Sequence, residues 1–376
     1  MTDTTIAAPA VATPAQRLAV ASQAQLVWWA FRRHKLAMAG LVITVILYVI
    51  ALVPGFFAIN DPEAQNARTP YHPPEAISIR TPEGQWQWPH FVPERLKRDP
   101  DTLAAIYVPD PEHAIPIVLF GHGYEYKLLG LFTTDIHLIA SANPREPFYL
   151  FGADRLGRCV WSRLIQGAQI SMSVGLVGVA LSLIIGIVLG GISGYYGGRT
   201  DFVIQRVIEF VLALPSIPIW LALAAALPQG WPATYQYMMI TVILSLTGWA
   251  QLARVVRGRF LALKTDEFVA AAKLDGCSEK RIIFRHMLPS FASHIIASIT
   301  LAIPAMILAE TALSFLGLGL QPPTISWGVL LREAQNIRSI ATAPWLFAPG
   351  IAVVLAVMAL NLLGDGLRDA ADPYNK

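Results

Sequence analysis

Side chains that could carry out catalysis are few in this 376-residue sequence. It contains no Gly-x-Ser-x-Gly nucleophile elbow and no His-Glu-x-x-His pair, which are motifs of serine and zinc hydrolases. It also lacks a Gly-Lys dipeptide, which the phosphate-binding loop of ATP-hydrolysing enzymes contains. We therefore expect no catalytic residue and no bound cofactor in this chain.

Metal-binding side chains are not arranged for a site either. Five of the eight histidines fall in one segment, but their spacing matches no ligand pattern such as a pair three or four residues apart. These are His72, His90, His113, His122 and His137. The two cysteines, Cys159 and Cys277, are more typical of small packing residues than of reactive thiols. We expect no metal site.

The composition is that of a membrane protein. Charged residues make up 14% of the chain and hydrophobic residues 55%, with a mean hydropathy of +0.50, whereas a soluble domain has about 25% charged residues. So few charges could not cover the apolar surface of a soluble protein. The net charge of +3 is too small to suggest nucleic-acid binding, and two cysteines exclude a disulfide scaffold.

Uncharged runs long enough to cross a bilayer core of roughly 30 Å predict six transmembrane helices. The runs are Leu36–Ile59, Leu164–Gly198, Phe210–Ala253, Leu288–Ala309 and Ser339–Gly364. The third run is divided by the turn-forming sequence Pro228-Gln229-Gly230-Trp231-Pro232, so it holds two helices. The predicted fold class is an all-α polytopic membrane protein.

Lysine and arginine in the connecting segments predict the orientation. The segment between the third and fourth helices has none, and Arg32, Arg33 and Lys35 precede the first helix. The segment between the fourth and fifth helices has eight: Arg254, Arg257, Arg259, Lys264, Lys273, Lys280, Arg281 and Arg285. We therefore expect both termini to be cytoplasmic and the segment between the first two helices to be external.

These boundaries divide the chain into five parts. Residues 1–35 are a cytoplasmic segment, 36–59 the first transmembrane helix, 60–165 an extracytoplasmic insertion, 166–366 a core of five transmembrane helices, and 367–376 a cytoplasmic tail. The insertion is rich in proline and cannot begin as a helix. Within it, Ile115–Leu119 and Tyr126–Thr133 are predicted as short strands of a small external cap.

Three prolines and one acid mark helices that could line a pathway. Pro215 and Pro218 are predicted to interrupt the third helix and Pro304 the fifth, and broken membrane helices often line a cavity. Glu310 is the only acid well inside an apolar run. A carboxylate there is costly and normally faces protein or water. It is either a pathway or gate residue, or a buried carboxylate that hydrogen-bonds to a helix end.

A row of glycines predicts close helix packing. Gly186, Gly190 and Gly194 recur every four residues in the second helix. Small residues at this spacing let another helix backbone approach closely. The neighbouring helix could belong to this chain or to a second subunit.

The basic segment between the fourth and fifth helices is predicted to contain two short helices. Asp266 is a suitable N-cap for Glu267–Asp275, Gly276 a suitable stop, and Ser278 a cap for a second helix that ends near Pro289. Their apolar side chains have no membrane to bury them, so a protein partner is the expected cover; a solvated charged surface is the alternative. These side chains are Phe268, Val269, Leu274, Ile282, Ile283 and Phe284.

This segment resembles the Glu-Ala-Ala/Gly/Leu-Pro loop of ABC importer permeases. The similar residues are Ala270-Ala271-Ala272-Lys273-Leu274-Asp275-Gly276 and, after a further nine residues, His286-Met287-Leu288-Pro289, with Ala270 at the position of the glutamate. Other segments are similar to the C-type permeases of the oligopeptide, dipeptide and nickel family. They are Arg33-His34-Lys35, Phe151–Arg163, Gly194–Arg199, Leu313–Gly319 and Asn361–Arg368.

The resemblance implies a type I ABC importer permease in the bacterial inner membrane. Such a permease would pair with a second homologous permease, bind one or two cytoplasmic ATPases that hold ATP and Mg²⁺, and receive an extracytoplasmic solute-binding protein. Residues 265–289, named here the coupling loop, would dock into a groove on the ATPase. The residues implied in this contact are Phe268, Ala270, Ala271, Ala272, Lys273, Gly276, Leu288 and Pro289.

Peptides are the substrate that the resemblance favours. A nickel chelate, an opine or an oligosaccharide is the alternative, because the binding protein largely sets specificity in this family. A secondary transporter is a distant alternative, since it would be expected to show an inverted repeat and we detect none in the sequence.

The insertion lies where a binding protein would land. Trp86, Trp88 and Tyr124 could anchor it, because tryptophan and tyrosine bury much area at little entropic cost. Asp154 and Arg155 are further candidate contacts. Alternatively, the aromatic side chains pack inside the cap or against the second permease.

Overall fold

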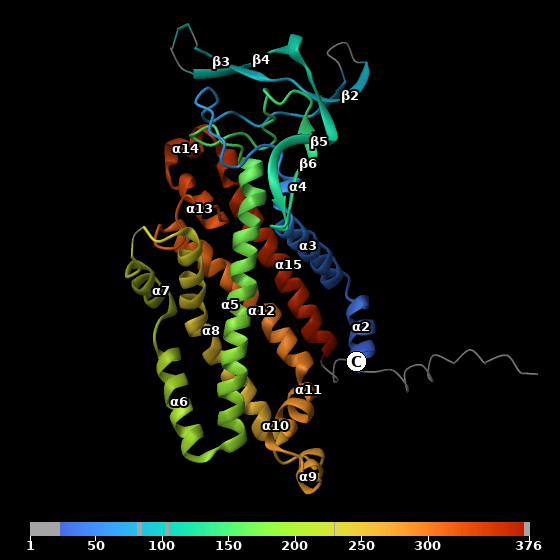
Figure 1. Ribbon diagram of the computed structural model, residues 1–376, viewed down its shortest axis with the longest axis vertical. Helices are drawn as coiled ribbons and strands as arrows, with labels where there is room; N and C mark the ends of the chain where they lie inside the picture. Colours follow the sequence, from blue (N-terminus) through green and yellow to red (C-terminus); the bar gives the residue numbers. More distant parts are fainter. Residues whose placement is uncertain (1–22, 81–84, 99, 102–104, 229, 372–376) are drawn as a thin grey trace, which may run out of the picture.

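Long helices dominate the structure, a computed structural model that describes residues 23–80, 85–98, 100–101, 105–228 and 230–371. Among these residues, five helices are long and apolar enough to span a membrane, and a bent pair of helices could form a sixth span. The five are α3 (Lys35–Leu52), α5 (Val160–Tyr196), α8 (Ala233–Leu263), α12 (Ala292–Phe315) and α15 (Ala348–Ala371). Figure 1 shows them as a bundle that carries the strands at one end.

The third span is broken, as its prolines predict. Helices α6 (Gly198–Ala213) and α7 (Ser216–Ala225) meet at an angle of 84°. Pro215 occupies the N-cap of α7 and has no amide hydrogen with which to continue α6. Pro218 lies in the first turn of α7, where its missing amide costs no intrahelical bond.

The predicted interruption at Pro304 was wrong. This proline lies inside α12, which continues to Phe315 as one helix. Its side chain is buried among packed neighbours, and such neighbours can hold a membrane helix together after the loss of one backbone hydrogen bond.

Short elements connect the long helices. Helix α2 (Gln23–Arg33) precedes α3, and α4 (Pro54–Phe57) follows it. Between α8 and α12 lie α9 (Glu267–Leu274), α10 (Glu279–Arg281), the π-helical turn η2 (Ile282–Met287) and α11 (Leu288–Ser290). Between α12 and α15 lie α13 (Trp327–Leu331), η3 (Arg332–Gln335), α14 (Ile337–Thr342) and η4 (Pro344–Phe347).

The insertion holds the β-structure. An antiparallel sheet has the strand order β1-β2-β5-β6, and a separate ribbon pairs β3 with β4. The strands are β1 (Ser78–Arg80), β2 (Trp86–Phe91), β3 (Glu94–Arg98), β4 (Ala105–Pro109), β5 (Ile115–Leu128) and β6 (Phe132–Ser141), and the 3-10 turn η1 (Pro111–His113) precedes β5.

Strands β5 and β6 form one long hairpin, whose turn corrects a prediction. The strand expected at Ile115–Leu119 is confirmed as the start of β5. The segment Tyr126–Thr133 is not one strand: it holds the end of β5, the turn and the start of β6, because Leu129 and Gly130 have φ values of 52° and 73° and reverse the chain. Leucines surround this glycine, and their apolar pattern is typical of a strand.

Buried hydrogen bonds join the insertion to the helices. Ser162 Oγ in α5 accepts the amides of Ile59 at 3.2 Å and Asn60 at 2.9 Å. Trp161 Nε1 donates to the carbonyl of Phe57 at 2.9 Å. Because α5 begins at Val160, its first turns serve as the base of the insertion, whose predicted range of 60–165 overlaps this helix.

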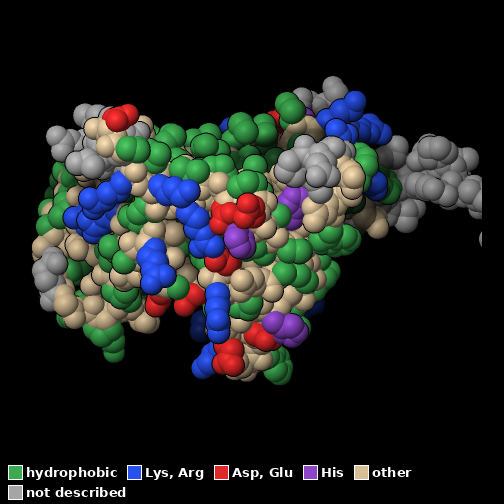
Figure 2. Space-filling view, turned by 90° about the horizontal axis from the view of Figure 1, so that it is seen from above, with side chains coloured by type: hydrophobic (Ala, Val, Ile, Leu, Met, Phe, Trp, Pro, Cys, Tyr) green, Lys and Arg blue, Asp and Glu red, His purple; other side chains and the backbone are tan. Residues whose placement is uncertain are grey.

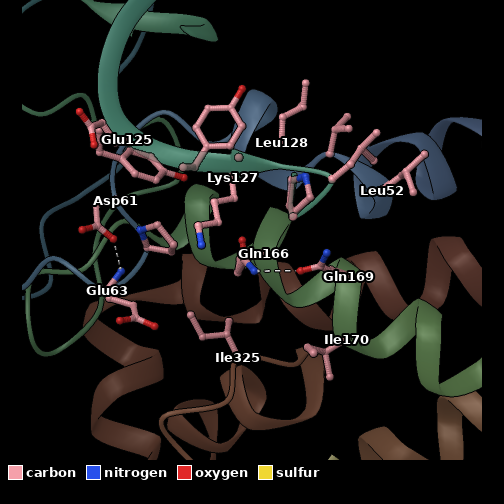
Figure 3. A pocket seen from close by; sticks show the side chains of 18 of the residues that line it. Leu52, Asp61, Glu63, Glu125, Lys127, Leu128, Gln166, Gln169, Ile170 and Ile325 are labelled. Carbon is pink, nitrogen blue, oxygen red and sulfur yellow. Dashed lines mark hydrogen bonds between the residues drawn. The ribbon is translucent and has the colours of Figure 1, made fainter. Parts of the chain in front are cut away.

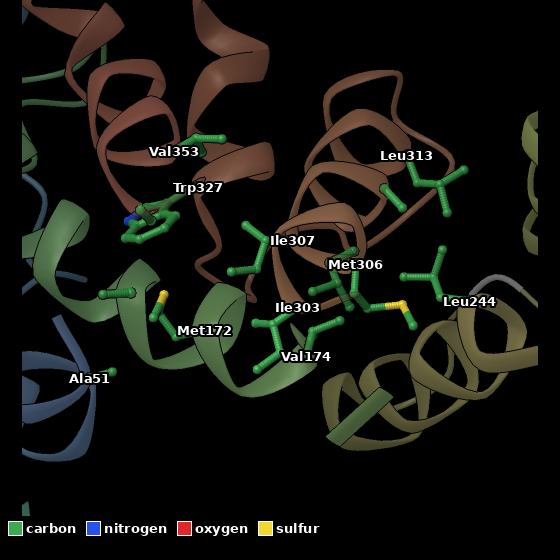
Figure 4. Packing of buried hydrophobic residues seen from close by; sticks show 14 of the residues in the cluster. Ala51, Met172, Val174, Leu244, Ile303, Met306, Ile307, Leu313, Trp327 and Val353 are labelled. Atoms are coloured by element: carbon green, nitrogen blue, oxygen red, sulfur yellow. The ribbon is translucent and has the colours of Figure 1, made fainter. Parts of the chain in front are cut away.

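The core of the bundle is apolar. Figure 4 shows Met172 of α5, Leu244 of α8 and Ile307 of α12, all with no exposed surface, among other buried aliphatic side chains. Trp327 of α13 closes one side, and its Nε1 donates to the carbonyl of Leu164 at 3.0 Å. The core therefore fixes the helices against which the loops pack.

The glycine row packs within this chain. Side-chain atoms at Gly190 would overlap the backbone of Ala253 in α8, and a Cβ at Gly194 would lie 2.7 Å from the carbonyl oxygen of Arg257. A Cβ at Gly186 would lie 3.0 Å from the side chain of Leu252, also in α8. Of the two alternatives, close packing of α5 on α8 is the one that the structure shows.

Candidate functional site

The coupling loop forms the end of the molecule opposite the sheet, with α9 as its outermost helix (Figure 1). Asp266 occupies the N-cap of α9 and Ser278 that of α10, although neither side chain makes a capping hydrogen bond. The two predicted short helices are confirmed. The start of each helix is therefore set by the backbone conformation at its N-cap and not by a side-chain hydrogen bond.

Gly276 ends α9 in a Schellman motif. Its amide donates to the carbonyl of Lys273 at 3.0 Å, and the amide of Cys277 donates to that of Ala272 at 3.0 Å. Gly276 has a φ of +71°, and nothing lies within 4 Å of a Cβ built on it. The position therefore needs glycine for its backbone conformation and not for lack of space.

One face of the coupling loop is buried against the rest of the chain. Val269 has no exposed surface and Ile282 is 1% exposed, and both pack with Phe260 of α8 and with Phe291. Ile283 is partly buried in the same cluster. The prediction that a protein partner covers these side chains was wrong for these three, because the loop folds back on the ends of α5 and α8.

The other face of the loop is exposed and apolar. Leu274 is 89% exposed, Phe284 61% and Phe268 39%. Ala270 and Ala271 are exposed on α9, whereas Ala272 is 6% exposed and packs inward. Leu288 is partly buried in the cluster and Pro289 is exposed in α11. Small residues on the outer surface of α9 leave room for another protein to approach it closely.

Two lysines contact the end of α5, one directly before the coupling loop and one within it. Lys264 Nζ donates to the carbonyl of Tyr195 at 2.6 Å and lies 5.9 Å from the centre of its ring. Lys273 Nζ lies 5.8 Å from the same ring. Tyr196 donates to Glu279 Oε2 at 3.0 Å, which joins α5 to α10 as well. Movement of the loop would therefore be transmitted to α5.

A cavity of about 370 Å³ lies among α5, α6, α7, α8 and α12. Its lining is mostly apolar, with a few hydroxyl groups, and Trp220 Nε1 donates to Thr247 Oγ1 at 3.1 Å in its wall. The lining includes Val179, Ser182, Leu214, Ser216, Ala302, Ala305 and Ala309. None of the four predicted pathway residues lines the cavity. Pro215, Pro304 and Glu310 adjoin lining residues in the sequence, and Pro218 lies between the lining residues Ser216 and Trp220.

Glu310 holds a buried polar cluster together. Its carboxylate has no exposed surface and accepts hydrogen bonds from Ser314 Oγ at 2.7 Å, Ser326 Oγ at 2.8 Å and Ser171 Oγ at 3.2 Å. Ser171 Oγ in turn accepts the amide of Trp327 at 3.1 Å, and Ser326 caps α13. The geometry is that of a buried carboxylate linked to a helix start, the second of the two alternatives above.

The serines of this cluster were not predicted. Ser171 lies on α5 and Ser326 lies 16 residues after Glu310, so only the fold brings them together. The usable signal was the acid itself, because a buried carboxylate requires several donors.

Arginines and carboxylates gather at the sheet end of the molecule. Figure 2 views this end and shows blue Lys and Arg side chains beside red Asp and Glu side chains. A cavity of about 550 Å³ is lined in part by Arg155, Arg158, Arg332 and Glu333. Arg158 Nη2 donates to Glu333 Oε1 at 3.2 Å, and burial raises the pKa of Glu333 above its usual range.

Asp154 and Arg155 differ in solvent exposure. Asp154 is 3% exposed, and its carboxylate accepts the amides of Leu156 and Arg158 at 2.8 and 3.0 Å and the Arg158 Nε at 2.6 Å. It is therefore not free to contact another protein directly, contrary to expectation. Arg155 has a side chain 66% exposed, 3.8 Å from Glu333.

The three candidate aromatic anchors also differ. Trp86 is 73% exposed and Trp88 62%, although Trp88 Nε1 donates to the carbonyl of Ile117 at 2.7 Å. Tyr124 is half-buried, because its ring packs on Tyr126 and on His137 at 4.6 Å between centroids. The two tryptophans are available for contact, and Tyr124 belongs largely to the cap.

A buried acid–histidine pair lies at the base of the cap. His72 and Glu75 are 1% and 5% exposed, and Glu75 Oε2 accepts the amide of Tyr149 at 2.8 Å. Desolvation raises the pKa of Glu75 to about 7 and lowers that of His72. Within the described residues no three His, Cys, Asp or Glu side chains are grouped to hold a metal ion.

Known protein families match most of the helical part. The model of the binding-protein-dependent transport system inner membrane component matches residues 186–375. The model of the N-terminal TM domain of oligopeptide transport permease C matches residues 22–74.

Individual relatives agree with these matches. The oligopeptide transport system permease protein OppC of Bacillus subtilis is 36% identical over 251 residues, covering 66% of this chain and 77% of the relative. The dipeptide transport system permease protein DppC of the same organism is 40% identical over 232 residues, covering 61% and 70%. The glutathione transport system permease protein GsiD of Pectobacterium atrosepticum is 38% identical over 225 residues, covering 60% and 72%.

Among solved structures, an inward-facing MetNI methionine ABC transporter is similar to this chain. The TM-score is 0.42 at 16% identity, covering 55% of this chain and 95% of the other.

Proposed function

Because the chain belongs to the family of binding-protein-dependent transport system inner membrane components, we propose that it forms half of the translocation pathway of an ATP-driven peptide importer. The chain is a multi-pass membrane subunit of an ABC importer. The members of its family are transport permeases, so we assign the hydrolysis of ATP to partner subunits. The partners that we propose are a second homologous permease, one or two ATPases that bind ATP and Mg²⁺, and an extracytoplasmic binding protein.

The two-faced coupling loop is the observation that carries this proposal. Its inner face is packed on α5 and α8, and its outer face exposes Leu274 and Phe284. Burial of a leucine or phenylalanine side chain contributes about 1.5–3 kcal/mol, so a groove that receives both would bind the loop firmly. An ATPase that changes shape with nucleotide would then pull on α5 through Tyr195 and its two lysine contacts.

Positive charges in the coupling loop and at the end of α8 before it support the placement of this end of the bundle in the cytoplasm. Eight lysines and arginines lie between residues 254 and 285, and short basic loops stay on the cytoplasmic side. The structure has α2 and the end of α15 toward the same end of the bundle (Figure 1). With this orientation the insertion is extracytoplasmic in the inner membrane.

We place the pathway beside the cavity of about 370 Å³ among α5 to α8 and α12. The break at Pro215 gives this region two helix ends that can rearrange. In a two-state pathway, nucleotide on the inside and the binding protein on the outside would each favour one arrangement. A second permease would complete the walls.

The substrate that we propose is a short peptide. The named relatives are permeases for oligopeptides, dipeptides and glutathione, which is itself a tripeptide. A nickel chelate, an opine or an oligosaccharide would contradict the peptide assignment without affecting the importer assignment. The exposed Trp86 and Trp88 and the exposed Arg155 are the residues of this chain that we propose to meet the binding protein.

Assembly and transport of the purified complex test the proposal. We expect Leu274→Asp and Phe284→Asp to release the ATPase on co-purification and to abolish uptake of labelled peptides in proteoliposomes. Leu316→Asp is the matched control, because Leu316 is 56% exposed at the far end of α12. Retention of the ATPase by both loop variants would overturn the docking assignment, whereas uptake of a non-peptide solute alone would overturn only the substrate.

A further inference from the structure

The tip of the β5–β6 hairpin is apolar at a place where turns are normally polar. Leu129, Leu131 and Phe132 are 51%, 76% and 67% exposed, whereas turns favour Gly, Asn, Asp and Ser. No charged residue lies between Lys127 and Asp135. An exposed apolar cluster of this kind requires a cover.

The hairpin is fixed in position rather than free to swing. The Tyr126 ring packs directly on Gly55 of α4, where any side chain would overlap it. The ring of His137 in β6 lies between two carbonyl oxygens, with Nδ1 2.7 Å from that of Gly55 and Nε2 3.0 Å from that of Tyr124. The tip therefore has a defined height relative to the helices.

The tip lies level with the outer end of α3. Leu128, Leu129 and Gly130 line one wall of a cavity of about 580 Å³ whose other walls include Leu52 and Val53. Figure 3 shows the hairpin running up to α3 close to Leu52. The exposed residues Val42, Val45, Val49 and Leu52 form one row along α3. This row is 46–62% exposed in an apolar helix, as expected of a surface that faces lipid.

The two sides of the hairpin end differ in polarity. In Figure 3 Lys127 points toward Gln166 inside the cavity. Tyr124, Asp61 and Glu63 line the same cavity, while Leu131 and Phe132 do not belong to its lining. The polar side chains therefore face the cavity together with Leu128 and Leu129, while Leu131 and Phe132 form an exposed apolar surface outside its lining.

We propose that the tip, residues 128–132, dips into the outer leaflet of the membrane beside α3. The lipid-facing row of α3 ends at Leu52, and the apolar tip continues it, so the same hydrocarbon boundary covers both. Apolar groups of interfacial segments insert about 5–10 Å into this boundary, with tyrosine and lysine at headgroup level. Lipid contact would hold the insertion at a fixed height above the bilayer. The inference depends only on the membrane location of the chain.

Spin labels on single cysteines in the assembled transporter in lipid nanodiscs test the proposal. The background carries Cys159→Ala and Cys277→Ser. The test position is Leu131→Cys, with Ile46→Cys next to Val45 of the α3 row as the lipid control and Glu125→Cys on β5 as the water control, since all three residues are exposed. We expect the label at 131 to collide with dissolved oxygen and to lose collisions with a water-soluble nickel chelate, as the label at 46 does.

Two other outcomes would overturn the proposal. Full access of the nickel chelate to position 131, as at 125, would place the tip in water. Loss of collisions with both oxygen and nickel would mean that protein, such as the second permease, covers the tip.

Discussion

Replacement of Gly276 by valine should uncouple the transporter without unfolding it. The residue has a φ of +71° in the Schellman motif that ends α9. For a residue with a Cβ this conformation costs about 1–2 kcal/mol, and branching at Cβ adds to it. Because a built Cβ meets nothing within 4 Å, the cost is confined to the backbone of the coupling loop.

The size of the effect can be measured on the amides that the motif protects. A loss of about 1–2 kcal/mol opens the motif about 5–30 times more often, so exchange at the amides of Gly276 and Cys277 should speed up by that factor. Stimulation of ATP hydrolysis by substrate-loaded binding protein should fall, because the loop then spends less time in the form that docks. Hydrogen exchange followed by mass spectrometry and a coupled ATPase assay report the two results.

Gly258→Val is the matched control. Gly258 lies inside α8 close to the loop, is exposed, and also has nothing within 4 Å of a built Cβ. Its helical backbone accepts valine about as well as glycine, so neither exchange nor coupling should change. If Gly276→Val speeds exchange and coupled transport stays normal, the loop is not the coupling element.

Three further predictions follow from buried contacts. Gly190→Ala should lower the free energy of unfolding by about 1–3 kcal/mol, as overpacking does, because its Cβ would overlap the α8 backbone. Thermal unfolding of the detergent-solubilised protein would show this, and Gly258→Ala should leave it unchanged. The pKa of Glu75 is about 7 in the folded protein and 4.5 in the unfolded chain, so between these pH values only the folded protein keeps the proton. The contribution of Glu75 to stability is therefore present at low pH and lost as pH rises to 7. Glu75→Gln should therefore raise the free energy of unfolding of the insertion at pH 8 by up to about 3 kcal/mol, which slower hydrogen exchange would report. At pH 4 the substitution should change little. Glu310→Ala should reduce stability, since three serine hydroxyls lose their acceptor, whereas Glu310→Gln should keep substantial transport; loss of transport by a stable Gln variant would favour a gate.

The sequence predicts the helices and the loop well because their signals are local. Uncharged runs of about 20 residues specify spans, and Gly276 specifies a helix end through its own backbone. The bend at Pro215 is local too, since proline removes a donor wherever it stands. These features require no knowledge of which elements pack together.

The errors concern contacts between distant elements. The pattern of Val269 and Ile282 does not reveal that α8 and Phe291 cover them. The glycine row shows that some helix approaches, but only packing identifies it as α8. The turn at Leu129 was read as strand because its apolar residues break the usual polarity of turns, and that break is the basis of the lipid contact that we propose.

Thiol labelling from each side of the membrane tests the predicted topology. Impermeant thiol reagents should label a cysteine at an external position only from outside and one at Lys264 only from inside. The exposed Glu112 is the external position, since Glu83 lies outside the described residues. Labelling of both positions from one side would contradict the six-helix topology.

Cross-linking from Leu274 in intact membranes tests the central claim most directly. This side chain is 89% exposed at the end of α9, and a photoreactive amino acid placed there should join the permease to an ABC ATPase subunit, identified by mass spectrometry. The same amino acid at Glu112 in the insertion should not yield that product. A cross-link from position 274 to lipid or to an extracytoplasmic protein, with no ATPase product, would contradict the account.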